Sequence, residues 1–458
     1  MQNLKRRLAP VVRKAMETYS VPGVSIGIVH GGVEHTMAAG VTCTEFPQDV
    51  DAETLFQIGS TTKTFTGTAL MMLVEEGLID LDATVRTYLP SFKLKDAATA
   101  RAATVRHLVT HTGGWRGDYF DDLGRGDDAL KKIVRRMATK TPQVTPLGTA
   151  WSYNNAGFYV LGRILEEVTG MRYEDLITTR IFQPLGMERS FFFPEDVITR
   201  KAALGHIARP DGSVIVSRPW ALPRSAHPAG GIVSSVEDQL RYMAFHLGNG
   251  TAGDGTRLMR SSTLKSMRKK LAPAGSMAEA VGVTWLLDRV GTTPVVKHGG
   301  SWSGQMSDLW LIPREDFGIT VLTNGSRGHE LSKVVIDWVV ANMLDLHPTP
   351  PAPRPLTARA ASAFTGIYEV TPQVEMTIAH DGDGLVLNYA PTKKALRANP
   401  DFLTDFSPTP PLELVMVGRD RAVAQGGYNT GARVEFIRDE NKQVAFVRAG
   451  GRMHPRAH

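Results

Sequence analysis

Residues 59–76 read Gly-Ser-Thr-Thr-Lys-Thr-Phe-Thr-Gly-Thr-Ala-Leu-Met-Met-Leu-Val-Glu-Glu. The apolar residues recur at helical spacing along one face, which predicts a helix that begins near Ser60. The residues of this face are Phe65, Ala69, Met72 and Leu73.

Ser60 and Lys63 stand at the start of this predicted helix, three positions apart. A helix N-terminus offers backbone N–H groups and a dipole that favour developing negative charge. Side chains at i and i+3 lie on the same face. A mostly apolar environment would lower the pKa of the Lys63 amine and make it a proton acceptor. The pair therefore predicts a nucleophilic serine assisted by a lysine.

The Ser-x-x-Lys pattern alone has low specificity, because the chain contains it three times. The other two copies run from Ser262 to Lys265 and from Ser266 to Lys269, in a Lys/Arg-rich stretch that indicates an exposed helix. A serine at a helix start is also a common N-cap without any chemistry. On this pattern alone, the N-cap interpretation of Ser60 is the more common one.

A second element, Trp151-Ser-Tyr-Asn-Asn-Ala-Gly157, contains Tyr153-x-Asn155, the one Tyr-x-Asn of the sequence. The apolar spacing predicts a helix just after it, so Tyr153 lies in the loop that enters this helix. A phenol near a lysine cation has a lowered pKa, and an asparagine amide can bind a substrate and a lysine together. A packed tyrosine beside a turn asparagine fits the same residues.

A third element is His298-Gly299-Gly300-Ser301, which enters a predicted strand pair. The two glycines allow a substrate backbone to lie close to the strand. The Ser301 N–H could join the Ser60 N–H in an oxyanion hole.

Taken together and in this order, Ser60-x-x-Lys63, Tyr153-x-Asn155 and His298-x-Gly300 resemble class C β-lactamases, D-alanyl-D-alanine carboxypeptidases and family VIII esterases. All belong to the serine β-lactamase and penicillin-binding-protein superfamily, which includes D-aminopeptidases. The similarity covers about residues 5–345. Further stretches carry it: Phe56-Gln-Ile-Gly, Val105-Arg-His-Leu-Val-Thr-His-Thr-Gly-Gly-Trp115 and Pro228-Ala-Gly-Gly-Ile-Val-Ser-Ser-Val-Glu-Asp238.

The resemblance implies a role for each matched residue. Ser60 is expected to be the nucleophile, and Lys63 and Tyr153 are expected to share the proton transfers, with either one as general base. The expected substrate-binding residues are Asn155, His298, Gly300 and Ser301. His298 departs from the Lys-Thr-Gly pattern of β-lactamases, where the lysine gives a fixed cation for a substrate carboxylate, whereas histidine is only partly charged near neutral pH. A histidine here is similar to the D-aminopeptidase branch.

The Pro-rich stretch His347-Pro-Thr-Pro-Pro-Ala-Pro-Arg-Pro355 divides the chain, because it cannot continue a helix or a central strand. We expect a catalytic domain over residues 1–346, a linker over 347–355 and a β domain over 356–458. In the large region, strands at 24–29, 309–313 and 318–323 with helices at 65–76 and 157–169 predict an α+β fold. Its sheet would draw strands from both chain ends and carry a helical insertion.

The C-terminal part reads as antiparallel strands. Residues 375–380 and 385–389 flank the turn Asp381-Gly-Asp-Gly384, and residues 433–438 and 444–448 repeat the pattern. A small barrel or sandwich is expected. The resemblance suggests a lipocalin-like barrel of the kind appended to D-amino-acid peptidases.

Composition excludes several classes of protein. Of the 458 residues, Cys43 is the one cysteine, so neither an intrachain disulfide nor a Cys-based zinc cluster is expected. The net charge of +6 is compatible with nucleic acid, but the densest basic run, residues 265–270, fits a solvated helix face and no nucleic-acid motif accompanies it. No run approaches a membrane span. The N-terminus reads as an amphipathic helix rather than a secretory signal, so we expect a cytoplasmic location.

Two other stretches match the patterns of known sites. Gly300-Ser-Trp-Ser-Gly304 matches the nucleophile elbow Gly-x-Ser-x-Gly, but that elbow needs a following helix, and a strand is expected after Gly304. His107 and His111 have the i, i+4 spacing of metal ligands, but no third ligand accompanies them. Packed or capping histidines are the favoured interpretation.

The sequence thus predicts a serine hydrolase that cleaves ester or amide bonds through an acyl-enzyme at Ser60 and needs no cofactor or metal. A carboxylesterase or a D-amino-acid-specific peptidase is favoured, with β-lactamase or DD-peptidase activity as an alternative. A catalytically silent binding protein on the same fold is the alternative of another class. The expected partners are small esters, amides or short peptides, not nucleic acid or membrane, with a homo-oligomer left open. Four aromatic residues could line an acyl site or simply be packed: Trp115, Tyr119, Phe120 and Trp302.

Overall fold

The computed structural model describes residues 2–209, 211–382, 384–398, 410–426 and 430–457. The chain falls into two units. The first unit contains Met1–Gly148, Asn154–Ala272 and Ala280–Pro348, and the second contains Thr149–Tyr153, Pro273–Glu279 and Thr349–His458.

The first unit is built on an antiparallel sheet that combines both ends of the region. Its strand order is β2-β1-β12-β11-β10-β9-β8-β7. The strands are β1 (Gly23–His30), β2 (Val33–Gly40), β7 (Ala272–Pro273), β8 (Ala280–Val281), β9 (Leu286–Val290), β10 (Thr293–Trp302), β11 (Gln305–Ile312) and β12 (Phe317–Thr323). Ile26 of β1 pairs with Val321 of β12, so the first strand joins the last directly. The predicted sheet from both chain ends is confirmed.

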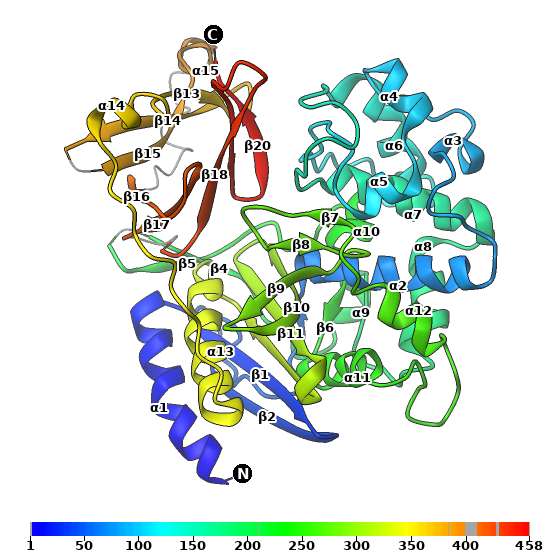
Figure 1. The fold of residues 1–458 in the computed structure, drawn as a ribbon. Helices are drawn as coiled ribbons and strands as arrows, with labels where there is room; N and C mark the ends of the chain where they lie inside the picture. The colour runs from blue at the N-terminus through cyan, green and yellow to red at the C-terminus, as the bar shows by residue number, and fades with distance from the viewer. Residues whose placement is uncertain (1, 210, 383, 399–409, 427–429, 458) are drawn as a thin grey trace. The chain divides into compact units, whose positions relative to one another are not determined.

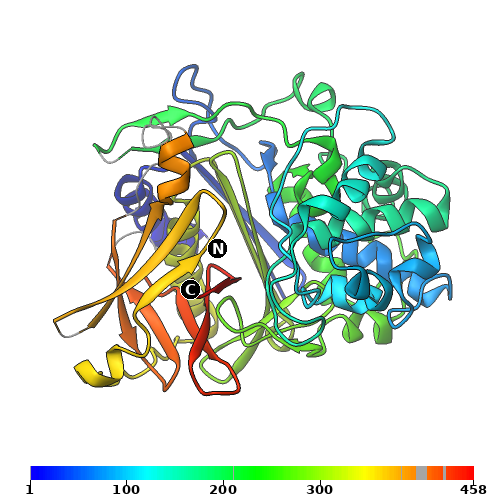
Figure 2. The same cartoon turned by 90° about the horizontal axis from the view of Figure 1, so that it is seen from above.

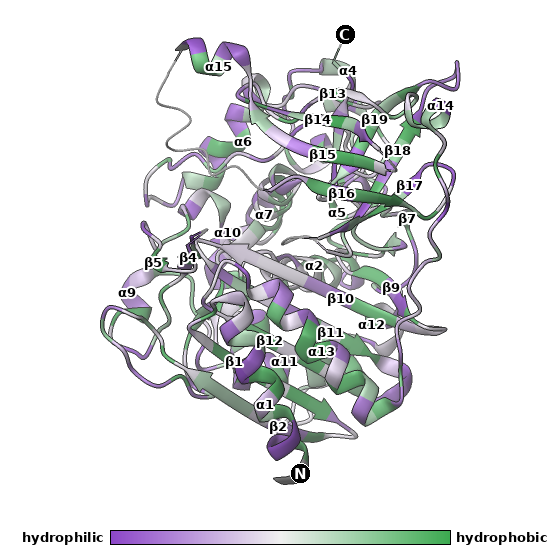
Figure 3. Cartoon of the chain, turned by 90° about the vertical axis from the view of Figure 1, so that its left-hand side faces the viewer, coloured by the Kyte–Doolittle hydropathy of each residue, from purple (hydrophilic) through white to green (hydrophobic). Residues whose placement is uncertain are grey.

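Helices cover both faces of this sheet, as Figures 1 and 2 show. The amphipathic helix expected at the N-terminus is α1 (Gln2–Tyr19), and it lies beside α13 (Gly328–Leu344) on one face. Val12, Ile26 and Val335 are buried in the same apolar cluster there. Figure 3 shows hydrophilic and hydrophobic residues along α1 and α13, in keeping with one buried side.

The opposite face is covered by a helical insertion that lies between β2 and β7. Gly27 on β1 leaves room there for Leu240 of α11, because a Cβ on Gly27 would be 3.1 Å from the Leu240 side chain. The helices are α2 (Thr62–Glu75), α3 (Val85–Tyr88), α4 (Ala97–Ala102), α5 (Val105–Val109), α6 (Ala129–Lys140), α7 (Asn155–Thr169), α8 (Tyr173–Ile177), α9 (Pro194–Val197), α10 (His227–Gly230), α11 (Val236–Leu247) and α12 (Ser261–Ser266). Two short strand pairs join them: β3 (Phe56–Gln57) with β6 (Val233–Ser234), and β4 (His206–Ala208) with β5 (Val214–Val216). The α+β fold is confirmed.

The second unit is an antiparallel barrel of eight strands in sequential order. The strands are β13 (Gly366–Glu369), β14 (Val374–Asp381), β15 (Gly384–Pro391), β16 (Leu412–Met416), β17 (Arg421–Gln425), β18 (Arg433–Arg438), β19 (Val444–Ala449) and β20 (Arg452–Pro455). A bridge between Tyr368 and Arg456 joins the first strand to the end of the last. Two short helices, α14 (Ala358–Ala361) and α15 (Lys393–Ala398), accompany it. The predicted barrel-like domain is confirmed, although Asp383 of the first predicted turn lies outside the described residues.

One expectation about a surface helix was wrong. The basic run at residues 265–270 is not the face of a helix, because α12 ends at Ser266. Arg268 lies beyond that end and donates a hydrogen bond to the His246 carbonyl. Within the residues that the structure covers, no helix is long and apolar enough to cross a membrane.

Candidate active site

Ser60 lies in a short turn that two hydroxyls hold against the sheet. Residues Gly59–Thr61 form the 3-10 turn η1, which continues directly into α2. Ser307 Oγ on β11 donates to the Ile58 carbonyl at 2.7 Å and is hydrogen-bonded to Thr61 Oγ1 at 2.8 Å. The N-cap residues of η1 and α2 are Ile58 and Thr61, and neither caps with its side chain. Ser60 therefore does not serve as a helix cap in this structure.

Lys63 brings the serine and the asparagine together. Its side chain is fully buried, and Nζ donates to Ser60 Oγ at 2.9 Å, to Asn155 Oδ1 at 2.7 Å and to the Ala229 carbonyl at 2.6 Å. The Phe158 ring lies 5.2 Å from Nζ. An amine held this way can exchange a proton with the serine hydroxyl.

Asn155 is the first residue of α7, and both the oxygen and the nitrogen of its side-chain amide form hydrogen bonds. While Oδ1 accepts from Lys63, Nδ2 donates to Asp118 Oδ1 at 2.6 Å. Asp118 and the Ala229 carbonyl were missed by the sequence reasoning. Ala229 does fall in the stretch Pro228–Asp238 that carries part of the family resemblance, whereas nothing in the sequence singled out Asp118.

Tyr153 belongs to the second unit, where it is buried. Its N–H donates to the Gly451 carbonyl at 2.8 Å, and the Arg452 guanidinium lies over its ring at 4.7 Å from the centroid. The next residue, Asn154, has an extended backbone with φ −144° and ψ 110°. Side chains two positions apart along an extended segment point to the same side, and the Tyr153 and Asn155 Cα atoms are at most about 7 Å apart. Tyr153 is thus joined to Asn155 through the single residue Asn154.

Of the two glycines predicted beside the substrate strand, Gly300 meets the Ser60 turn closely, whereas Gly299 faces Asp308 and Ser307. A Cβ on Gly300 would lie 1.9 Å from the Ile58 carbonyl oxygen and 2.7 Å from the Ser60 nitrogen. A Cβ on Gly59, whose φ is +46°, would lie 2.5 Å from the Ser301 nitrogen. The backbone amides of Ser60 and Ser301 are therefore close neighbours, as an oxyanion hole requires.

We expect Gly300→Ala to lower kcat/KM for ester hydrolysis by about 100-fold, because the methyl group forces the Ser60 turn away from β10. The atoms it would meet belong to backbone, which cannot rotate aside as a side chain can. Gly253→Ala is the matched control, since a Cβ there meets nothing within 4 Å. Initial rates and thermal unfolding of both variants check this. Turnover of Gly300→Ala near that of the unmodified protein would contradict the close approach.

His298 is buried in β10, with 2% of its surface exposed. Burial, followed by the nearby Lys63 charge, lowers the pKa of His298 to about 3, against the opposing effect of its hydrogen bond to the Gly299 carbonyl. The imidazole is therefore neutral at physiological pH and does not supply a fixed cation.

The residues of the two competing motifs, Ser303, His107 and His111, take part in turn and capping contacts. Ser303 lies in the turn between β10 and β11 with φ +46°, and a strand follows it. His107 caps the start of α5, and His111 Nδ1 accepts from the Asn154 N–H at 3.0 Å. Across the described ranges, no cluster of three or more His, Cys, Asp or Glu side chains is placed to hold a metal ion.

The four aromatic candidates divide into two groups. Trp115 is buried, and Tyr119 packs edge-on against the ring of Tyr159. Phe120 and Trp302 instead face each other, with ring centroids 5.6 Å apart, and Phe120 is 37% exposed. Phe120 follows Asp118 by two residues and Trp302 follows Ser301, so this pair lies beside the Ser60 centre.

The sequence is similar to several known proteins. A family model described as Beta-lactamase matches residues 8–339. Penicillin-binding protein 4 of Amycolatopsis lactamdurans is 32% identical over 361 residues, which cover 77% of this chain and 94% of that protein.

Two solved structures share the fold. SurE matches with a TM-score of 0.77 and 23% identity over 100% of both chains. The D-amino acid amidase from Ochrobactrum anthropi SV3, solved with L-phenylalanine amide, matches with a TM-score of 0.62 and 23% identity over 73% of this chain and 99% of its own. Since the family model covers well over half of the sequence and the relative exceeds 30% identity, the chain belongs to the β-lactamase family of serine hydrolases.

Proposed function

We propose that this protein cleaves ester or amide bonds through an acyl-enzyme at Ser60, as a carboxylesterase or a D-amino-acid-specific peptidase. The observation that carries the proposal is the position of Lys63 Nζ, 2.9 Å from Ser60 Oγ and 2.7 Å from Asn155 Oδ1. A buried amine bonded to a serine hydroxyl at a helix start is the arrangement that activates an oxygen nucleophile.

In the first half-reaction, Ser60 Oγ attacks the substrate carbonyl carbon while its proton passes to Lys63 or Tyr153. The carbonyl oxygen gains the negative charge of the tetrahedral intermediate beside the amides of Ser60 and Ser301. The same proton then moves to the leaving alkoxide or amine as its bond to carbon breaks. Asn155 accepts a hydrogen bond from Lys63 through its side-chain amide, which we expect also to bind the substrate.

In the second half-reaction, a water molecule replaces the leaving group. The Lys63 and Tyr153 pair takes a proton from the water as its oxygen attacks the acyl carbon, and returns a proton to Ser60 Oγ as the ester bond breaks. The products are the free acid and the regenerated serine. No step requires a metal or an organic cofactor.

Because His298 is neutral, the proposal favours ester and amide substrates that place no carboxylate group beside this residue. A β-lactam carboxylate would meet a neutral imidazole there instead of a fixed positive charge. The Phe120 and Trp302 pair supplies an apolar wall suited to a hydrophobic acyl group. The names of two structural neighbours point the same way, since one is a D-amino acid amidase and SurE was also solved with D-Leu.

A second candidate function is β-lactam recognition, which the 32% identity to a penicillin-binding protein favours. A penicillin-binding protein would be acylated by the β-lactam and release it slowly. A β-lactamase would hydrolyse it with rapid turnover.

Hydrolysis of p-nitrophenyl butyrate, D-alanine p-nitroanilide and nitrocefin by the full chain, with Ser60→Ala as the blank, tests these functions. We expect Ser60-dependent turnover of the ester or the D-alanyl amide to exceed that of nitrocefin by about tenfold or more, which corresponds to about 1.4 kcal/mol in the barrier. The L-alanine anilide is the matched control for stereochemistry. Turnover confined to nitrocefin would contradict the proposal and favour the β-lactamase alternative. Absence of Ser60-dependent turnover on all of them would contradict the proposal and favour a silent binding protein or a penicillin-binding protein that releases the β-lactam slowly.

A further inference from the structure

The short helix α10 turns its carbonyl groups toward α2 and so contacts the lysine of the site. The Pro228 carbonyl accepts from Thr66 Oγ1 at 2.7 Å, and the Ala229 carbonyl accepts from Lys63 Nζ at 2.6 Å. A helix of four residues has no stability of its own in water, since it forms hardly any internal hydrogen bonds. The place of the Ala229 carbonyl must therefore be fixed by the residues around α10.

A buried carboxylate on α8 holds α10 in place. Glu174 Oε1 lies 2.7 Å from His227 Nδ1, at the start of α10, and Arg224 just before it donates to both Glu174 oxygens at 3.1 and 3.2 Å. The three side chains are 6%, 3% and 10% exposed, respectively. The neighbouring Tyr173 hydroxyl is hydrogen-bonded to Thr66 Oγ1 at 2.8 Å, so α8 holds α10 and α2 together.

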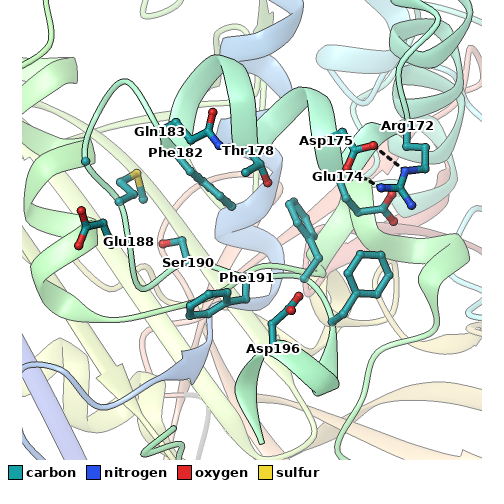
Figure 4. A pocket seen from close by; sticks show the side chains of 14 residues that line it. Arg172, Glu174, Asp175, Thr178, Phe182, Gln183, Glu188, Ser190, Phe191 and Asp196 are labelled. Carbon is teal, nitrogen blue, oxygen red and sulfur yellow. Dashed lines mark hydrogen bonds and ion pairs between the residues drawn. The ribbon is translucent and has the colours of Figure 1, made fainter. Parts of the chain in front are cut away.

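A cavity lies beside this buried carboxylate. A cavity of about 550 Å³ is lined on one side by Glu174, Phe192 and Phe193. Figure 4 shows the Glu174 side chain among those around this cavity. Phe192 and Phe193 also contact the His227 ring, with centroids 5.5 and 5.4 Å away. The His227 ring is therefore held both by these aromatic contacts and by its hydrogen bond to Glu174.

We propose that Glu174 is a positioning residue for Lys63, acting through His227 and Arg224 to hold the Ala229 carbonyl against the lysine amine. Its side chain binds His227 and Arg224, so it acts through them as a positioning residue and not as a catalytic residue. This inference rests on the proposed function of Ser60 and Lys63 and adds a supporting residue behind them.

The charge of Glu174 persists over the whole range of a practical assay. Burial alone would raise its pKa, but the hydrogen bonds and charges of His227 and Arg224 outweigh burial and hold the pKa at about 2, below the ordinary 4.5. The stabilisation from this carboxylate is therefore complete above about pH 4.5 and is lost only as pH falls toward 2. The other charged groups around it are Glu166 on α7, Asp127 beside Arg224, and Arg172 with Asp175 on its own segment.

Glu174→Gln tests the proposal, because it removes the charge while keeping the size of the side chain. The rate at which a fluorophosphonate labels Ser60 is measured against pH, together with ester turnover and the unfolding temperature. We expect labelling and kcat to fall about 10- to 100-fold, with KM changed far less, because the Lys63 amine is displaced from Ser60. The pH midpoint of the acidic limb should move to lower pH, since an ammonium that loses an accepting carbonyl and a nearby negative charge deprotonates more easily.

Asp175→Asn is the matched control, since it removes the adjacent carboxylate, which pairs with Arg172 and is 43% exposed. Its labelling rate and pH midpoint should match those of the unmodified protein. His227→Asn alters the His227–Glu174 contact from the α10 side. It should therefore shift the pH midpoint in the same direction as Glu174→Gln. Rates are compared per folded molecule, at a temperature below each unfolding transition, so that a loss of stability alone does not imitate the effect.

Labelling of Glu174→Gln and His227→Asn with unchanged rate and pH midpoint would overturn the positioning role. Absence of Ser60 labelling in the unmodified protein would instead overturn the proposed function. The two failures are distinct, because the first leaves an active Ser60 and the second does not.

Discussion

Ser60→Ala is expected to lower kcat/KM for the preferred ester or amide by roughly 10⁴-fold or more, because only binding and oxyanion stabilisation remain once the nucleophile is removed. The fold should tolerate the change. Ser60 does not cap a helix, and its turn is held by Ser307 and Thr61. Lys63 also keeps its hydrogen bonds to Asn155 and Ala229. The measurement is initial-rate kinetics at equal concentrations of folded protein.

Ser262→Ala is the control for this result. Ser262 begins the second Ser-x-x-Lys of the chain and is exposed, so its loss should leave turnover unchanged. A Ser60→Ala variant that turns over at the rate of Ser262→Ala would remove Ser60 from the reaction.

Tyr153→Phe is expected to lower kcat by about 10²- to 10⁴-fold, the range of a lost acid–base group. The substitution removes one hydroxyl and keeps the ring, so the contact with Trp151 and the Arg452 guanidinium above the ring remain. Tyr153 lies two residues before Asn155 in the sequence, and Asn155 binds Lys63. If this hydroxyl carries protons, the pH–rate profile should lose or shift its basic limb along with the fall in kcat.

Tyr119→Phe is the matched control for the tyrosine. Its hydroxyl lies 3.5 Å from the Ile133 carbonyl, and burial raises its pKa, so it has no place in a proton relay. Normal turnover of Tyr153→Phe, equal to that of Tyr119→Phe, would assign the base role to Lys63 without the phenol.

The part of the fold that follows from local pattern could be predicted from the sequence. Apolar spacing placed α2 and α7, and alternating runs placed β1, β12 and the barrel hairpins, because these signals depend on neighbours a few residues apart. A sheet with strands from both chain ends was also expected, but the direct pairing of β1 with β12 joins segments far apart in the sequence, which no local pattern specifies. The proposed division at residues 347–355 stays a prediction, and segments 149–153 and 273–279 group with the second unit without any local signal.

The supporting contacts of the site could not be predicted in the same way. Asp118 meets Asn155 across 37 residues, and the Ala229 carbonyl meets Lys63 across 166. A backbone carbonyl has no residue type to mark it, and a carboxylate in a loop resembles any solvated one. Glu174 illustrates the same point, because a glutamate beside Arg172 and Asp175 reads as surface charge until the fold buries it.

The most direct test of the central claim is peptide mapping by mass spectrometry after rapid quenching with p-nitrophenyl butyrate or a D-aminoacyl ester. The acyl-enzyme account predicts one acyl group per chain, attached to Ser60, that disappears on further incubation and is absent from Ser60→Ala. An acyl group on Ser303 or any other residue, or rapid turnover with unmodified Ser60 at every quench time, would contradict it.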